Sequence, residues 1–422
     1  MFFLFDLCFL IYILFYLPIM LLRGKWHNGM KARLGFIPDP ILDRLRGRRN
    51  IWLHAVSVGE VMAVEGMIRR LREQFPDRQI ILSVTTRAGH ALARRRYADT
   101  SLVIWSPLDL SLTVRIFVAA IRPEIYIAAE TELWPNLFAR LAQERVKILI
   151  VNGRISDAAF PRYRLVRGWL KSVLAKVSLF CMQSDLDVRR IVELGAPSER
   201  VVNVGNVKFD LTSDLAQASP GELGLEPGKL VWVAGSTHPG EEELVLGVYE
   251  SLCTQFPDLR LVVAPRHPER APGIVQMIAK SGLIPILFST ANRKPLGAGE
   301  VLVVDTIGHL VQFYSVATVV FVGKSLTVRG GHNIIEPGIF GKPVLVGPHM
   351  QNFMDITRAF MDSQAVVQVP DATALRSELE RLLASSEERG LLGQRARDVI
   401  QRNRGATERT IKIITRIYGV HV

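Results

Sequence analysis

From residue 51 onwards the chain alternates short apolar runs with longer amphipathic stretches. One stretch has apolar residues at helical spacing and predicts a helix over 61–75, with a stripe formed by Val61, Val64, Ile68, Leu71 and Phe75. The apolar runs are typical of strands that are buried on both faces of a sheet. They predict strands at 51–56, 79–84, 102–105, 124–128, 147–152, 179–182 and 201–205. This order of strands and helices indicates βα units around a parallel sheet.

The alternation is interrupted once. Segment 211–229 is rich in Gly, Pro, Ser and Asp and lacks a sustained period, so it predicts a linker. Beyond it, strands are predicted at 230–234, 259–264, 301–304, 318–322 and 343–346, with helices that include 241–256 and 374–383. We therefore expect an α/β protein with two doubly wound domains, 23–210 and 230–422. Such sheets bind ligands at the carboxyl ends of their strands, so two facing sheets are expected to form a cleft.

The N-terminus is strongly apolar. Over 1–22 the only charged residue is Asp6, and a helix of that length spans ~33 Å, enough to cross a bilayer. No basic residue precedes the run and no small-residue cleavage site ends it, so it is not typical of a cleaved signal peptide. Basic residues follow from Arg23, which places the rest of the chain in the cytoplasm. Because Asp6 and Pro18 interrupt the run, both a spanning anchor and a helix lying in the interface remain open.

Segment 161–176 gives a second membrane signal. Apolar residues that include Trp169 share one helical face, and arginines and lysines fill the remainder. A basic amphipathic helix with a Trp suits an anionic membrane surface. The alternative is an ordinary surface helix whose apolar side packs into the core.

Composition narrows the function classes. The chain has 422 residues, which suggests two or three domains, and 49% are hydrophobic, which excludes a wholly disordered chain. There are 52 Lys and Arg against 40 Asp and Glu, a net charge of +12. Three distant cysteines form no disulfide framework and indicate a reducing compartment, and nine scattered histidines without HExxH argue against a zinc hydrolase. Neither GxGxxG nor GxxxxGK[ST] opens a helix, which argues against NAD-dependent redox chemistry and P-loop hydrolysis.

Four candidate residues of the first half lie just after predicted strands. Glu60 stands at a helix start, where the macrodipole favours the ionised carboxylate, and a carboxylate facing a cleft can act as a general base. The alternative is that Glu60 only caps the helix. Glu130 and Glu132 flank a threonine after strand 124–128, either as a site or as a charged helix entrance. Lys208 follows strand 201–205 and projects either over the sheet edge or to the surface.

The second half has features of a nucleotide site. Ser236 and Thr237 follow strand 230–234 and are candidate phosphate ligands, although three glutamates in the next helical turn already compensate its dipole. Arg266 ends strand 259–264, where a guanidinium can clamp a phosphate. The Gly-rich run 323–337 offers bare backbone amides to a phosphate, and Glu336 can accept both hydroxyls of a ribose.

Five phrases, in this order, resemble the Kdo transferase family: HAVSVGE at 54–60, ETELWPN at 130–136, GNVKFD at 205–210, APRHPER at 264–270 and GGHN at 330–333. Members of this family move 3-deoxy-D-manno-oct-2-ulosonic acid (Kdo) from CMP-Kdo to the lipid A precursor (lipid IVA) in lipopolysaccharide assembly. The resemblance extends over nearly the whole chain, including the N-terminal anchor. It implies a GT-B fold of two Rossmann-like domains, with no metal or other cofactor and inversion at the anomeric carbon.

Residue roles follow from the same resemblance. Glu60 would deprotonate the acceptor hydroxyl, and Glu130 and Lys208 would stabilise the transition state. The CMP moiety would be surrounded by Pro265, Arg266, Ile307, Gly308, His309, Asn333, Ile334, Ile335 and Glu336. Lys208 either pairs with the Kdo carboxylate or supports a neighbouring acid. An anionic glycolipid acceptor in the inner leaflet would account for the anchor and the positive charge, with both domains on the cytoplasmic face of a bacterial inner membrane.

The chain departs from the family pattern at two positions. His309 stands where an acidic residue is common, which puts one CMP contact in doubt. Lys324 stands where a second glycine is frequent and would add a cation near the anionic donor.

Two other functions fit the outline. A nucleotide-sugar epimerase shares the two-domain architecture but needs no lipid acceptor and therefore no anchor. A non-enzymatic basic scaffold on nucleic acid or membrane is permitted by the charge, but no nucleic-acid motif is present, so we expect no nucleic-acid partner.

Overall fold

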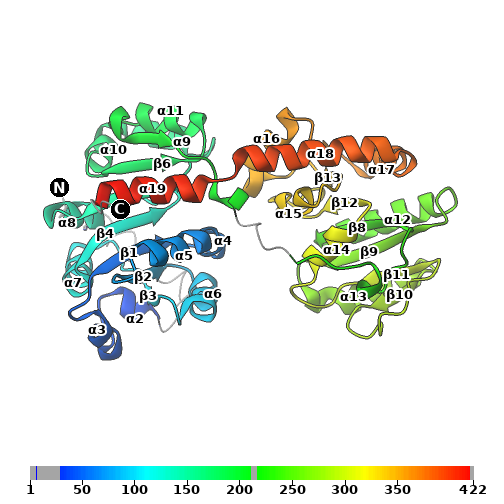
Figure 1. Ribbon diagram of the computed structural model, residues 1–422, viewed down its shortest axis with the longest axis horizontal. Helices are drawn as coiled ribbons and strands as arrows, with labels where there is room; N and C mark the ends of the chain where they lie inside the picture. The colour runs from blue at the N-terminus through cyan, green and yellow to red at the C-terminus, as the bar shows by residue number, and fades with distance from the viewer. Residues whose placement is uncertain (1–5, 7–28, 211–215, 419–422) are drawn as a thin grey trace. The chain divides into compact units, whose positions relative to one another are not determined.

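The computed structural model describes Asp6, residues 29–210 and residues 216–418 (Figure 1). The chain forms two compact units, one comprising 1–211 and 404–422 and the other 212–403. Each unit is an α/β fold built on a parallel sheet, as the sequence predicts.

The first unit contains a seven-stranded sheet in the order β3-β2-β1-β4-β5-β6-β7. The strands are β1 (Asn50–Ala55), β2 (Gln79–Val84), β3 (Leu102–Trp105), β4 (Pro123–Ala129), β5 (Lys147–Gly153), β6 (Leu179–Met182) and β7 (Val201–Asn203). Every neighbouring pair is parallel, and Leu53 on β1 lies opposite both Leu82 and Ile127. The strand order reverses between β1 and β4, which makes the loops after these two strands the expected ligand position.

Helices cover both faces of this sheet. They are α2 (Gly29–Arg33), α3 (Asp39–Leu45), α4 (Val58–Ala63), α5 (Glu65–Gln74), α6 (Arg87–Tyr97), α7 (Ser111–Ile121), α8 (Pro135–Gln143), α9 (Phe160–Leu165), α10 (Arg167–Leu174), α11 (Asp185–Glu193) and α19 (Ala406–Tyr418), with short 3-10 turns η1 (Ser198–Arg200) and η2 (Val207–Asp210). Along β1, Trp52 packs into the core shared with α7, α8 and α10, while Ile51 and Leu53 pack into the opposite core with α4, α5 and α19. This alternation is what a strand buried on both faces requires.

The second unit repeats the plan with the strand order β10-β11-β9-β8-β12-β13-β14. Its strands are β8 (Leu230–Thr237), β9 (Leu259–Pro265), β10 (Ile284–Leu287), β11 (Glu300–Val303), β12 (Val319–Val322), β13 (Val344–Val346) and β14 (Val367–Gln368). Its helices are η3 (Gly221–Leu223), α12 (Glu241–Cys253), η4 (Pro268–Arg270), α13 (Ala271–Lys280), α14 (Leu310–Val316), α15 (Ile335–Ile339), η5 (Gln351–Phe353), α16 (Met354–Asp362), α17 (Ala372–Ala384) and α18 (Ser386–Asn403). Here the order reverses between β8 and β12.

The structure departs from the predicted segmentation in three places. The helix predicted over 61–75 is two helices, α4 and α5, that meet at Val64, although its apolar stripe is buried as expected. Residues 216–229 of the predicted linker are part of the second unit, because Leu223 and Leu225 are buried there. The predicted C-terminal domain, 230–422, extends too far, because the helix α19 belongs to the first unit. Ile411 and Ile414 of α19 lie in the core that contains α5.

The predicted N-terminal anchor cannot be compared with the structure directly. Apart from Asp6, the anchor predicted over 1–22 lies outside the described residues. Within the residues that the structure describes, no helix has the length and apolarity needed to cross a bilayer. The Asp6 carboxylate accepts hydrogen bonds from the Ser111 backbone N–H (3.1 Å) and the Asn136 side-chain amide (2.7 Å).

The amphipathic helix predicted over 161–176 is α9 and α10, which meet at Val166. The interpretation as a surface helix that packs into the core is correct for Leu170, which is buried. Leu165 is 86% exposed and Trp169 is 39% exposed, and their contact with a membrane stays a prediction.

Asp210 holds the returning C-terminal helix on the first unit. Its two carboxylate oxygens accept hydrogen bonds from the backbone N–H groups of Gly405 and Thr407, both 2.6 Å long, at the start of α19. We expect Asp210→Ala to destabilise the first unit by about 1–3 kcal/mol, because two charge-assisted helix-cap bonds are lost. Asp210→Asn keeps one acceptor oxygen, so its stability should lie between that of wild type and that of Asp210→Ala.

Urea or thermal denaturation of the full chain measures this effect. The control is Asp362→Ala, at an exposed aspartate on α16. Equal stability of Asp210→Ala and the control would show that the carboxylate does not hold α19.

Candidate functional site

The loop after β1 places Glu60 in a capping box at the start of α4. Ser57 caps the helix by accepting a hydrogen bond from the Glu60 N–H (3.4 Å), and its hydroxyl donates to the Glu60 carboxylate (2.9 Å). The other carboxylate oxygen accepts the Val56 N–H at 2.8 Å. The sequence Ser-x-x-Glu is the known signature of this arrangement. The capping role that the sequence left open is therefore present, and it fixes the carboxylate in one orientation.

Burial changes the acid strength of Glu60. Glu60 is only 6% exposed, and the loss of hydration is the main reason that its pKa is raised. The negative charge of Glu130 raises the pKa further. The expectation that the helix dipole would favour ionisation is wrong in its net direction, since burial outweighs it. A carboxylate with a raised pKa is a stronger proton acceptor once ionised.

Glu130 and Lys208 are brought together by β4 and η2. The Lys208 ammonium lies 3.8 Å from a carboxylate oxygen of Glu130, and both side chains are largely buried. The structure thus places Lys208 beside a neighbouring acid, and which of the two roles it has in the reaction stays a prediction. Glu130 has a positive φ of 55°, a left-handed conformation that costs a non-glycine residue about 1–2 kcal/mol. Such strain at the end of a central strand is common at functional sites.

Glu132 is the residue of this site to which sequence analysis gave no role. Burial first, and then the charges of Glu60 and Glu130, raise its pKa to about 7. The three carboxyl groups therefore form one electrostatic cluster at the reversal point of the sheet. The signal in the sequence was the pair of acids beside Trp134.

A rigid aromatic support lies beneath this cluster. His54 is buried, its ring lies edge-on to Trp134 at 5.8 Å, and its Nδ1 lies 2.9 Å from the Ser83 hydroxyl. Burial lowers the His54 pKa to about 3, so the ring is neutral at physiological pH. His54 thus supports the acidic loop without neutralising it.

In the second unit, Glu241 organises the loops after β8 and β12. Its fully buried carboxylate accepts backbone N–H groups of His238, Lys324, Ser325 and Leu326 at 2.7–3.0 Å. Glu242 is also fully buried and forms a two-pronged ion pair with Arg270. The three glutamates that were expected to compensate a helix dipole therefore include two that fasten loops. Whether Ser236 and Thr237 bind phosphate stays a prediction.

Two glycines and Lys324 shape the loop after β12. Gly330 and Gly331 have positive φ values of 141° and 74°, and a Cβ atom on Gly331 would lie 2.5 Å from the Met350 sulfur. A Cβ atom on Gly330 would meet the Lys324 side chain at 2.8 Å. Lys324 itself has a φ of 57°, which explains why glycine suits its position. The Lys324 side chain is therefore held close to the glycine pair. The expectation that this pair offers bare amides is wrong, because the Gly331 N–H donates to the Lys324 carbonyl (2.7 Å) and the Gly330 N–H donates to the Gln351 side-chain oxygen (2.9 Å).

Imidazoles and cations gather beside this loop. The Nε2 atoms of His238 and His332 lie 3.2 Å apart, and the His238 and His267 ring centres are 5.9 Å apart. Burial, and then the positive charges of Arg266 and Lys324 among others, lower the His332 pKa to about 3. Because His332 is neutral at physiological pH, Arg266 and Lys324 supply positive charge here, which suits an anion.

The structure connects three of the predicted CMP residues. Glu336 accepts a hydrogen bond from the Asn333 amide at 3.1 Å, and its pKa is raised by burial although Asn333 and Arg266 oppose that shift. The side chains of Pro265, Ile334 and Ile335 are buried in the sheet and helix packing, so only their backbone groups can face a ligand.

The turn before α14 carries the other predicted CMP contacts. Ile307 is 85% exposed, Gly308 has a φ of 97°, and the His309 ring lies 2.9 Å from the Thr306 hydroxyl. These roles stay predictions. In the part of the chain that the structure describes, no group of three or more His, Cys, Asp or Glu side chains is arranged to hold a metal ion.

The raised pKa of Glu132 gives a testable pH dependence. The folded protein holds this proton up to about pH 7, while the unfolded chain releases it near 4.5, so the site loses stability as pH rises between these values. Glu132→Gln copies the protonated form. We expect it to match wild type at pH 4 and to be more stable at pH 8 by about 1 kcal/mol, a value reduced for solvent screening.

Denaturation at both pH values, with the exposed Glu199→Gln as control, measures the difference. A pH-independent effect of Glu132→Gln would contradict the raised pKa.

Known proteins resemble the chain in sequence and in fold. The sequence model described as 3-Deoxy-D-manno-octulosonic-acid transferase (kdotransferase) matches residues 28–211. The 3-deoxy-D-manno-octulosonic acid transferase of Haemophilus influenzae is 32% identical over 92% of this chain and 91% of its own length. That of Bordetella pertussis is 30% identical, with the same two coverages of 92% and 91%.

Two solved structures share the fold. A glycosyltransferase from Rickettsia africae has a TM-score of 0.56 at 12% identity, with 89% of this chain and 100% of that chain covered. The UDP-GlcNAc 2-epimerase from Neisseria meningitidis has a TM-score of 0.58 at 10% identity, with 87% and 100% covered. These two structures support the two-domain, GT-B-like architecture alone, whereas the sequence relatives decide the family. The chain belongs to the 3-deoxy-D-manno-octulosonic acid transferase family.

Proposed function

We propose that the protein transfers Kdo from CMP-Kdo to the lipid A precursor, lipid IVA, with inversion at the anomeric carbon. An acceptor hydroxyl forms a bond to that carbon, its proton passes to Glu60, and the bond to the CMP phosphate breaks. The observation that carries the proposal is the buried, fixed carboxylate of Glu60, whose raised pKa suits a general base.

The pair formed by Glu130 and Lys208 has a second role in this proposal. Bond breaking builds positive charge on the sugar ring, and Glu130 can stabilise that charge. Lys208, 3.8 Å from the Glu130 carboxylate, places a positive charge beside this group of three carboxyl groups. It is also able to meet the Kdo carboxylate when the donor binds.

The second unit would hold the donor. We propose that Arg266 and Lys324 bind the phosphate, and that Glu336 binds the ribose hydroxyls. Phosphate charge can be balanced by these two cations, so the proposed reaction needs no metal ion or other cofactor. In this proposal the acceptor bound at Glu60 reacts with the donor bound by the second unit.

We further propose that the protein works at the cytoplasmic face of a bacterial inner membrane. The segment 1–22 would anchor it, and α9 and α10 would touch the surface. The exposed Leu165 and Trp169 beside Arg162 and Arg164 support the second contact, because basic and apolar side chains together suit an anionic bilayer.

Glu60→Gln separates the catalytic role from the capping role. Glutamine also completes a capping box, so we expect nearly unchanged folding and CMP binding. Loss of the proton acceptor should lower kcat about 10²–10⁴-fold. Mass analysis of the glycolipid formed from CMP-Kdo and lipid IVA measures turnover, with the exposed Glu65→Gln as control. If Glu60→Gln turns over at nearly the wild-type rate, Glu60 is not the general base and only caps the helix.

Lys324→Gly tests the cation beside the proposed phosphate site. Glycine suits the backbone angle at this position, so the fold should be kept or slightly stabilised. Loss of the charge should raise the KM for CMP-Kdo by about threefold to tenfold, with kcat less affected. Lys294→Gly, at an exposed lysine of the same unit, is the control. An unchanged KM would remove Lys324 from the donor site.

A further inference from the structure

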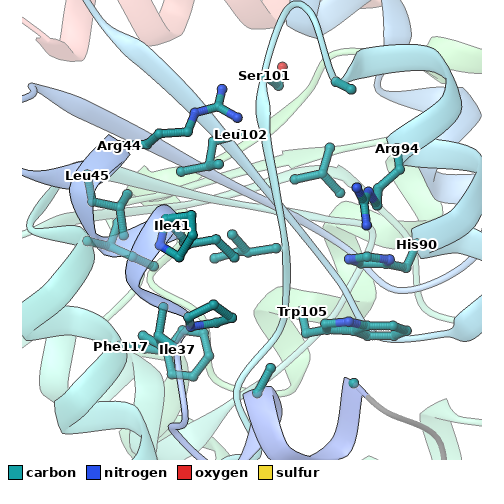
Figure 2. A pocket seen from close by; sticks show the side chains of 18 of the residues that line it. Ile37, Ile41, Arg44, Leu45, His90, Arg94, Ser101, Leu102, Trp105 and Phe117 are labelled. Carbon is teal, nitrogen blue, oxygen red and sulfur yellow. The ribbon is translucent and has the colours of Figure 1, made fainter.

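A large cavity lies at the edge of the first unit's sheet, beside β3 (Figure 2). Its volume is about 780 Å³, within the range of small-molecule sites. In the described part of the sheet, β3 pairs with β2 only, and α2, α3, α6 and α7 form the remaining walls. None of the catalytic or CMP-binding candidates lines it.

The interior of this cavity is apolar. Its walls include Leu45, Leu102, Ile104 and Phe117, each at most 5% exposed. The Trp105 ring stacks on His90, with centroids 3.9 Å apart and an angle of 3° between planes. This flat pair closes one end of the cavity in Figure 2. Such walls favour a hydrocarbon chain over a polar ligand.

The rim is cationic. Arg44, Arg87 and Arg94 line the cavity and are exposed, and no Asp or Glu is among the residues that line it. Figure 2 shows Arg44 and Arg94 on either side of the β3 ribbon. Among the described residues, none of these three arginines forms an ion pair. An apolar interior with a positive rim is complementary to an anionic head group on an acyl chain.

The surroundings connect this cavity to exposed apolar surface and to the catalytic loop. Phe36, which directly precedes Ile37 of the cavity wall, is 72% exposed. On the other side, α6 packs against the loop that carries Glu60: a Cβ atom on Gly89 would lie 3.2 Å from the Ser57 backbone. Since Gly89 stands between Arg87 and His90 of the lining, this wall of the cavity is continuous with the contact to that loop.

We propose that this cavity binds an acyl chain of the anionic glycolipid acceptor and that the arginine rim binds an acidic group of its head. The inference rests on the proposed function for the identity of the acceptor. It adds a place where the acceptor is held. Arg44 and Arg94 are positioning residues, because they hold the lipid without touching the reacting atoms.

The test uses the full chain in lipid nanodiscs and two sets of variants. Ile41→Trp fills the cavity, and the double change Arg44→Ala, Arg94→Ala removes the rim charge; Arg95→Ala, on the same helix but outside the lining, is the control. Both test variants should raise the KM for acylated acceptor by at least about tenfold and leave the KM for CMP-Kdo unchanged. With a deacylated acceptor, Ile41→Trp should behave as wild type. Thermal unfolding checks that each variant folds.

A binding measurement separates this proposal from the proposed function. Acceptor and phosphatidylglycerol, each with a photoactivatable acyl chain, are cross-linked to the wild-type protein, and labelled peptides are mapped by mass spectrometry. Labelling of 29–45 and 87–105 by the acceptor analogue, lost in Ile41→Trp, is the expected result even if no Kdo is transferred. Labelling by phosphatidylglycerol alone, no labelling of these segments, or unchanged KM values in both variants would overturn the proposal.

Discussion

The reversal of strand order in each sheet is the constraint on which both candidate sites depend. Crossovers on opposite sides of β1 and β4, and again of β8 and β12, lead the following loops away from each other. Side chains on these loops therefore lie at the carboxyl edge of each sheet. Glu60 and Glu130 come from the first pair of loops, and His238 and Lys324 from the second. The same topological feature thus collects acids in one unit and cations in the other.

Both sites are held by buried carboxylates with different tasks. Glu241 is fully buried and accepts hydrogen bonds from four backbone N–H groups, so it holds the loops after β8 and β12 in place. Glu60 also accepts two hydrogen bonds, yet burial and a neighbouring acid still raise its pKa. Like charges near Glu60 make its proton affinity sensitive to changes at Glu130 and Glu132. The acidic cluster should therefore be understood as one coupled unit.

Much of the fold was predictable because central parallel strands are continuous apolar runs. The predicted β1 to β9 segments are confirmed within a few residues. Two strands, β10 and β14, were missed: β10 is a half-exposed edge strand that contains Pro285, and β14 has two residues. The assignment of α19 to the first unit depends on packing of Ile411 and Ile414 against distant residues, for which the local sequence contains no signal.

The candidate site was predictable in its residues but not in its electrostatics. Motif resemblance pointed to Glu60, Glu130 and Lys208, and the structure joins the last two in an ion pair. The direction of the Glu60 pKa shift and the part taken by Glu132 depend on burial and on charges that approach only in three dimensions. No periodic pattern along the chain encodes those quantities.

The return of α19 also governs when the first unit can mature during synthesis. Ile411 and Ile414 pack into its core, and Asp210 accepts hydrogen bonds from N–H groups that lie 195 and 197 residues further along the chain. Domains usually fold in order as they leave the ribosome. Here all strands of the first unit are translated well before α19, so one side of its core stays uncovered until α19 emerges. A premature stop shortly after residue 403 would therefore damage the N-terminal unit, although every strand of its sheet had been made.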